Sequence, residues 1–168
     1  MYLIRERFFD LGDDFDITDA DGRLVLHVDG KALSPRGRLV IEDPSGQELA
    51  SVHRRLIALR ETYTITVGEE KAAEVRKKFF TPFGERFVID VPGPDDLEMR
   101  GHLFDHEYSV RRGGQEVAHV SKRWLTLRDT YAVRIEDGED EVLILAAVLA
   151  LDLAAARADD RDDKGDDE

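Results

Sequence analysis

Two stretches of this chain, GQELASVHRRLIALRETYTITV at residues 46–67 and GQEVAHVSKRWLTLRDTYAVRI at residues 114–135, are identical at ten of twenty-two positions. Chance does not produce such a match within one chain, so the sequence predicts an internal duplication. The two halves are expected at residues 1–67 and 72–135. Each half is then expected to form the same set of strands, so the repeat is the strongest evidence for the fold.

Short β-rich runs fill both halves and are separated by Gly, Pro and Asp at hairpin spacing, which predicts twelve antiparallel strands. Asp19 to Gly22 and Asp43 to Gly46 are typical of tight turns, because Asp bonds the backbone and Gly accepts a positive φ. Residues 69–79 also have helical propensity, which would delay the seventh strand. The expected strands are 2–9, 14–18, 24–29, 38–43, 47–53, 62–67, 74–81, 85–91, 96–101, 106–112, 115–122 and 130–135.

The pattern changes after these strands, because residues 142–151, VLILAAVLAL, are apolar at every position. Ala and Leu favour a helix, which we expect at 139–158. A helix that is apolar all round has to be enclosed. The run is shorter than the roughly 20 residues that cross a bilayer, so no transmembrane segment is predicted.

A barrel accounts for both patterns. Closure removes the exposed edges of a long antiparallel sheet, and a barrel of more than about eight strands leaves a lumen to be filled. The predicted fold is therefore a closed antiparallel barrel of about twelve strands, from two duplicated halves, that encloses one hydrophobic C-terminal helix. The alternative, a β-sandwich with a flanking helix, predicts a polar stripe on that helix. The single domain would span 1–158, and 159–168 would form a disordered acidic tail.

The amino-acid composition excludes several classes of function. The chain has 168 residues, no cysteine and a net charge of −13. Absence of cysteine excludes disulfides and thiolate chemistry, and the charged start favours a cytoplasmic location. A chain this acidic is repelled by nucleic acid, so no nucleic-acid partner is expected.

Several segments together resemble the LURP-one-related family: DITDADGRLVLHVDGK at 16–31, SKRWLTLRDTYAV at 121–133 and DEVLILAAVLALD at 140–152. That family is similar in fold to the Tubby C-terminal domain and to phospholipid scramblases. The resemblance implies a twelve-stranded barrel threaded by a C-terminal helix. Tubby-type domains bind phosphoinositide head groups through basic residues, whereas this chain is strongly acidic and lacks the cysteine-rich segment of scramblases.

Basic side chains supply the candidate ligand site, because lysine and arginine hold phosphate groups. Three lie together beside Phe79 and Phe80, and the others lie in equivalent strands of the two halves. In a strand, neighbouring residues face opposite ways, so a solvated strand face is the competing interpretation. The predicted anionic head-group ligands are Arg54, Arg55, Arg76, Lys77, Lys78, Lys122 and Arg123.

Metal and catalytic motifs give weaker signals. His102, Asp105, His106 and Glu107 form the densest set of metal-ligand types, but four residues of strand would separate the two histidines by about 13 Å. The acidic residues between Asp13 and Asp21 lack the spacing of a calcium loop. We therefore predict no metal, no cofactor and no catalytic residue.

The sequence favours a non-enzymatic intracellular binding or scaffold module with an unknown ligand. One alternative is a peripheral membrane module that binds anionic phospholipid or phosphoinositide head groups. A second alternative is an enzyme with a site at one mouth of the barrel.

Overall fold

The computed structural model describes residues 1–5, 14–29, 38–57, 60–81, 84–93, 95–102, 105–122 and 130–162. Within these ranges it describes every side chain except those of Arg5, Phe15 and residues 56–57, 60–61, 78–81, 84–85 and 155–162. The strands are β1 Tyr2–Arg5, β2 Phe15–Asp19, β3 Leu24–Asp29, β4 Arg38–Glu42, β5 Glu48–Ile57, β6 Arg60–Val67, β7 Glu70–Thr81, β8 Gly84–Asp90, β9 Leu97–His102, β10 Glu107–Arg112, β11 Gln115–Ser121 and β12 Thr130–Ile135. One helix, α1 Glu141–Asp162, follows.

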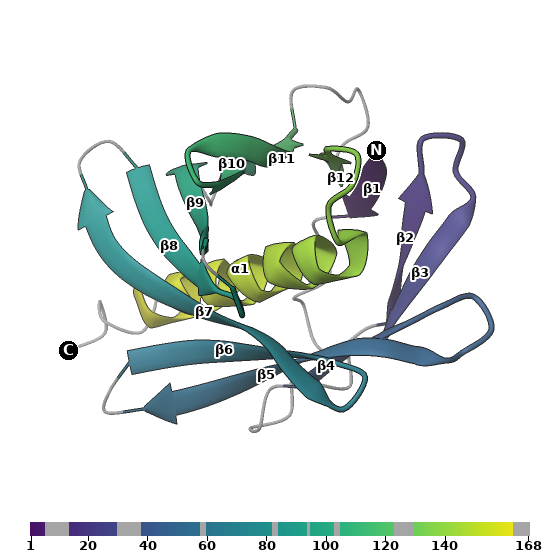
Figure 1. The fold of residues 1–168 in the computed structure, drawn as a ribbon, viewed down its shortest axis with the longest axis horizontal. Helices are drawn as coiled ribbons and strands as arrows, with labels where there is room; N and C mark the ends of the chain where they lie inside the picture. The colour runs from purple at the N-terminus through teal and green to yellow at the C-terminus, as the bar shows by residue number, and fades with distance from the viewer. Residues whose placement is uncertain are drawn as a thin grey trace.

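The strands form a closed barrel in which neighbours along the chain pair antiparallel (Figure 1). Pairing of β1 with β12, from Tyr2 opposite Val133 to Arg5 opposite Thr130, joins the first strand to the last. The predicted closed barrel of twelve antiparallel strands with one C-terminal helix is thus confirmed. Closure leaves every strand paired on both sides, which removes the edges that promote aggregation.

Alternation of side chains along the strands supplies the core. In β4, Leu39 and Ile41 are buried while Arg38 is exposed, and in β9 Leu97 and Met99 are buried. Side chains that face each other across a strand pair share one face of the sheet. The buried face of the whole barrel is therefore its inner face, on which these apolar residues pack.

The segment with helical propensity, residues 69–79, lies in β7, which begins at Glu70. The predicted delay of this strand to residue 74 was therefore wrong. Ala73 and Val75 fill the core at the two-residue period of a strand, and β7 pairs with both β6 and β8. These long-range contacts outweigh the local propensity of Ala and Glu. The first predicted strand, 2–9, is seen as 2–5, and its remainder lies outside the described residues.

Short turns close the end of the barrel at which α1 begins, called the entry end below. Asp19 Oδ1 accepts the backbone N–H groups of Asp21 and Arg23, both at 2.9 Å. Asp43 Oδ1 accepts those of Ser45 and Gln47 at 2.8 and 3.0 Å. Gly22 and Gly46 follow with φ of 80° and 85°. Both predicted turns are confirmed, with Asp and Gly in their expected roles.

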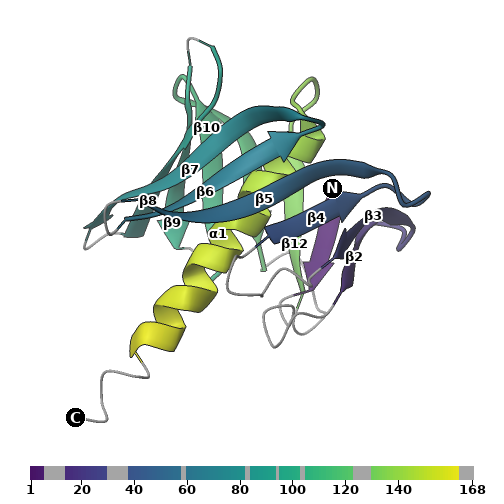
Figure 2. The ribbon, with the colours of Figure 1, turned by 90° about the horizontal axis from the view of Figure 1, so that it is seen from below.

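The helix begins at a capped N-terminus. Asp140 accepts the backbone N–H of Leu143 at 3.0 Å through its side chain, which is the N-cap bond of a helix start. Compared with the predicted span of 139–158, α1 starts two residues later and ends four residues later. All side chains from Ile144 to Leu153 are buried. Figure 1 shows α1 running between the strands, and Figure 2 shows its last turns projecting beyond them.

Candidate functional site at the exit end of the barrel

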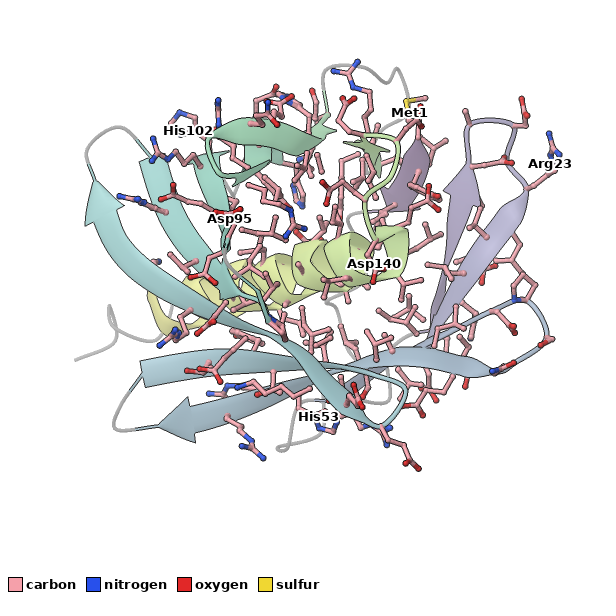
Figure 3. The ribbon with its side chains drawn as sticks, viewed as in Figure 1. Met1, Arg23, His53, Asp95, His102 and Asp140 are labelled. Carbon is pink, nitrogen blue, oxygen red and sulfur yellow. The ribbon has the colours of Figure 1, made fainter. Side chains whose placement is uncertain are left out.

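The end of the barrel from which α1 projects, called the exit end below, contains the predicted basic residues. Figure 3 shows the two ends, with Asp140 and Arg23 near the start of the helix and His102 at the opposite end. Arg54 and Arg55 lie in the exit-end part of β5, and Arg76 and Lys77 lie in that of β7. Lys122 follows the last residue of β11, Ser121.

Two of these cations face into the barrel. Arg54 lies opposite Tyr63 across β5 and β6, and the Tyr63 side chain is 2% exposed. Lys77 lies opposite Phe87 across β7 and β8, with its Nζ 5.6 Å from the centroid of the Phe87 ring. Paired residues share a sheet face, so both cations belong to the inner face, where they are partly buried.

Arg55 and Arg76 face the outside of the same strands and are exposed. Arg76 lies 2.5 Å from Asp90 Oδ2 and 3.6 Å from Glu74 Oε1. The Lys71 ammonium, bonded to Glu74 at 2.5 Å, is the first cause that lowers the pKa of that carboxyl, and the charges of Arg76 and Arg55 add to it. The outer cations are therefore accompanied by carboxylates on their own face of the sheet.

Lys122 follows β11 directly, in a bend outside the paired residues. It lies two residues beyond Val120, which is fully buried, and its own side chain is partly buried. The pairing of β10 with β11 ends with Glu107 opposite Ser121, so His106 and Lys122 are the next residues outward on the two strands. The Lys78 side chain and all of Arg123 lie outside the described residues, so their assignment remains a prediction.

A buried carboxylate from the helix lies near these residues. Asp152 is 2% exposed and accepts a short hydrogen bond from the Tyr131 hydroxyl through Oδ2. Its other oxygen, Oδ1, lies 3.4 Å from Nε2 of His106. The His106 ring stacks on Tyr131, with centroids 4.3 Å apart and planes inclined by 24°. Three elements, namely α1, β12 and the turn between β9 and β10, therefore meet at one carboxylate.

The backbone of His106 is unusual as well. Its φ of 46° makes it the one non-glycine residue with positive φ within the described ranges. Histidine enters this region more readily than most residues, yet the conformation still costs energy. The strained backbone belongs to the residue that stacks on Tyr131 and faces Asp152, so the contacts around Asp152 help to stabilise the turn.

Two tyrosines next to this carboxylate remain protonated. Burial is the first cause that raises the pKa of Tyr108 and of Tyr131 well above the ordinary value, and the charge of Asp152 raises both further. Each side chain is therefore a neutral hydroxyl at physiological pH, able to donate one hydrogen bond. Within the part of the chain that the structure describes, the buried Tyr108 hydroxyl and Asp152 Oδ1 make no hydrogen bond.

The sequence contains only weak evidence for the cluster of Asp152, Tyr131 and His106. Asp152 is the one charged residue within the buried run from Ile144 to Leu153. Tyr63 and Tyr131 occupy equivalent places in the two repeats. A single carboxylate in an apolar helix was the available signal, because buried charges require partners.

The candidate metal ligands among residues 102–107 are divided between two strands, because His102 ends β9 and Glu107 begins β10. His102 lies opposite Glu107 in the pairing of β9 with β10, and His102 and Asp105 are exposed while His106 is partly buried. Over the residues that the structure describes, no three side chains of His, Asp or Glu come close enough to hold a metal ion.

A surface pocket of about 260 Å³ lies at the opposite end of the barrel. Its charged lining residues, Lys71 and Asp90, are bonded to Glu74 and Arg76. Among the described residues, no helix is both long and apolar enough to cross a membrane.

Comparison with known proteins identifies the family. The family model described as LURP-one-related matches residues 1–152. The chain belongs to the LURP-one-related family. The uncharacterized protein YxjI of Bacillus subtilis (strain 168) is similar to this chain, at 30% identity over 160 residues, which cover 94% of this chain and 95% of YxjI.

Plant members of the LURP-one-related family are also similar. Protein LURP-one-related 14 of Arabidopsis thaliana is 31% identical over 158 residues, covering 83% of this chain and 76% of that protein. The X-ray structure of the Arabidopsis thaliana protein AT5G01750 superposes with a TM-score of 0.67 at 14% identity, covering 92% of this chain and 90% of that one. At this identity the structural match establishes the shared fold alone.

Proposed function

We propose that this LURP-one-related protein is a non-enzymatic binding module that holds an anionic group, such as a phosphate, at the exit end. One observation carries the proposal. That end bears three partly buried cations, namely Arg54 and Lys77 on the inner face and Lys122 just after β11, in a chain whose net charge is −13. These three residues are called the mouth cations below.

The position of the mouth cations favours an anion. Water screens a partly buried charge less than an exposed one, so a partly buried cation attracts an anion more strongly than a cation on an open face. Arg54 adds a planar fork of donors that matches a phosphate or carboxylate. The outer cations Arg55 and Arg76 lack this advantage, because their side chains are exposed and water screens their charge.

The other side chains at the exit end favour binding of a charged group over proton transfer. The Tyr108 and Tyr131 pKa values are raised by burial, which keeps both hydroxyls protonated. Asp152 is buried and already bonded to Tyr131. Neither phenol is thus poised as a general base at neutral pH.

We also propose that the two halves arose by duplication and enclose α1 between them. Tyr63 and Tyr131, which the repeat makes equivalent, are both buried on the inner face. Arg54 and Lys122 are equivalent in the same way. The buried run of α1 then acts as a scaffold that fills the barrel and leaves binding to the rim.

The test compares inner with outer cations in the full chain. Titration calorimetry with inorganic pyrophosphate would measure the affinity of the parent, of Arg54→Gln/Lys77→Gln and of the matched control Arg55→Gln/Arg76→Gln. Each charge-assisted bond contributes about 1.5–3 kcal/mol, so we expect the inner pair to weaken binding at least about tenfold. The outer pair should change it by less than about threefold.

Two outcomes would contradict the proposal, namely equal losses in both pairs or no measurable binding of pyrophosphate or vesicles by the parent. Vesicles with and without phosphoinositide, sedimented with the protein at low salt, distinguish a membrane head group from a soluble phosphate. Pelleting that the inner pair abolishes would identify a membrane source. Pyrophosphate binding without pelleting would identify a soluble ligand.

A further inference from the structure

We propose that Asp152 fixes the position of α1 along the axis of the barrel and so acts as a register lock. Its contacts with Tyr131 and His106 join the helix to two separate parts of the wall. This inference is independent of the ligand proposed above. It concerns how a helix with apolar surroundings selects one of several similar placements.

The buried run of α1 resembles itself when it is moved by four residues. Leu145 and Leu149 form one such pair, as do Ala146 and Ala150, Ile144 and Val148, and Leu149 and Leu153. A shift of four residues moves a helix by about 6 Å and returns it to nearly the same rotation. Apolar contacts are not directional, so these four pairs would keep similar surroundings after such a slide, whereas Ala147 and Leu151 differ in size and oppose it.

Asp152 distinguishes these placements in both directions. Sliding α1 toward the entry end would place the carboxylate at the site of Val148, which is fully buried. A carboxylate without a hydrogen-bond donor in an apolar core is strongly unfavourable. Sliding α1 toward the exit end would break the bond from the Tyr131 hydroxyl and leave that buried donor without its acceptor.

The strands and turns of the barrel offer partners to the Asp152 carboxylate at one position along the barrel axis. Tyr131 supplies the donor from β12, and His106 reaches the other oxygen from the turn between β9 and β10, despite its φ of 46°. Buried polar groups often contribute more to structural specificity than to stability, since apolar side chains of similar size can replace them at little cost. We therefore expect the lock to select a register without raising the melting temperature.

The test uses the absence of cysteine in the natural sequence. Spin labels on Arg100→Cys, which lies on the outer face of β9, and Asp162→Cys, at the end of α1, report the position of the helix relative to the wall. Pulsed electron resonance would then measure the label distance in the full chain. The parent should show one distance, whereas Asp152→Leu should show a second population, displaced by up to about 6 Å.

Tyr131→Phe is the milder variant, because it removes only the hydroxyl that donates to Asp152. It should also show a second distance in about 10% of the molecules or more. A second register that is close in free energy to the first is populated at about that level. Tyr63→Phe is the matched control. It removes the equivalent buried hydroxyl on β6, six strands away around the barrel, and should keep one distance.

One unchanged distance in both Asp152→Leu and Tyr131→Phe would overturn the register lock. If Asp152→Leu does not fold, one unchanged distance in Tyr131→Phe alone would overturn it. A second distance in Tyr63→Phe would do the same, because any lost phenol would then suffice. Melting temperatures measured on the same samples should differ from that of the parent by only a few degrees, which separates a register change from unfolding.

Discussion

The two ends of the barrel are built from different kinds of contacts. At the entry end, Asp19 and Asp43 bond backbone groups two and four residues further along the chain. At the exit end, Tyr131 bonds Asp152 across 21 residues, and His106 lies beside the same carboxylate from another part of the wall. Local sequence therefore determines these turns of the entry end, whereas the contacts around Asp152 form only when distant elements meet.

The largest effect should come from a carboxylate placed at the wrong height on α1. Leu145 is 1% exposed near the entry end, and Asp152 is 2% exposed near the exit end. Leu145→Asp would bury a carboxylate in an apolar part of the core, with an expected cost of about 4 kcal/mol in unfolding free energy. Chemical denaturation monitored by circular dichroism measures this loss.

Leu145→Met is the volume-matched control for this position, and it should cost less than about 1.5 kcal/mol. A Leu145→Asp variant as stable as the parent would show that the start of α1 reaches water. The comparison of the two helix positions would then fail, because a carboxylate would be tolerated at both.

A second comparison is between two glycines, Gly101 at the exit end and Gly46 at the entry end. An alanine Cβ at Gly101 would lie 2.5 Å from the Glu107 carbonyl oxygen and 2.7 Å from Tyr108 Cβ, with φ at 142°. Gly101→Ala should therefore cost about 3 kcal/mol, because the facing strand has to move. At Gly46 no atom lies within 4 Å of the added carbon, so only the φ of 85° opposes alanine, at about 1 kcal/mol.

Melting curves of the two variants check this order. Equal losses would indicate that Tyr108 moves away without cost, and the tight contact between β9 and β10 would then not limit the exit end. A larger loss in Gly46→Ala would reverse the comparison, because the open turn would then be the more constrained of the two positions.

These differences explain how far the sequence could predict the molecule. The hairpins followed from short β-rich runs and from turns such as Asp43 to Gly46, whose bonds are local. The closed barrel followed from the need to remove the exposed edges of a long antiparallel sheet. The start of β7 was missed because the propensity of residues 69–79 is local, whereas pairing with β6 and β8 determines the structure. Sequence alone gives no measure of that competition.

The candidate site was predicted only in part for a related reason. The basic residues were recognised by type, but alternation along a strand assigns Arg54 and Lys77 to the inner face only when the pairing partners Tyr63 and Phe87 are known. Asp152 and His106 are 46 residues apart in the chain and meet only in the closed barrel. No local pattern records such a contact.

The smallest effect concerns acid sensitivity at the entry end. The Ser45 hydroxyl, which donates to Asp43 at 2.6 Å, is the first cause that lowers the pKa of this carboxyl, and the N–H of Gln47 is the next. Because the pKa is lower in the folded protein, the stabilisation is fully present above the ordinary value of 3.8 and is lost as the pH falls through the folded value.

Asp43→Ala should remove this contribution, so the loss of stability between pH 5 and pH 2 becomes slightly shallower than in the parent. Ser45→Ala isolates the first cause, since it removes only the hydroxyl donor and should raise the pKa of Asp43 part of the way toward its ordinary value. Carboxyl carbon shifts, followed by NMR titration, give that pKa directly. An unchanged pKa in Ser45→Ala would mean that the backbone donors alone stabilise the charge, which would make this turn independent of its side-chain partner.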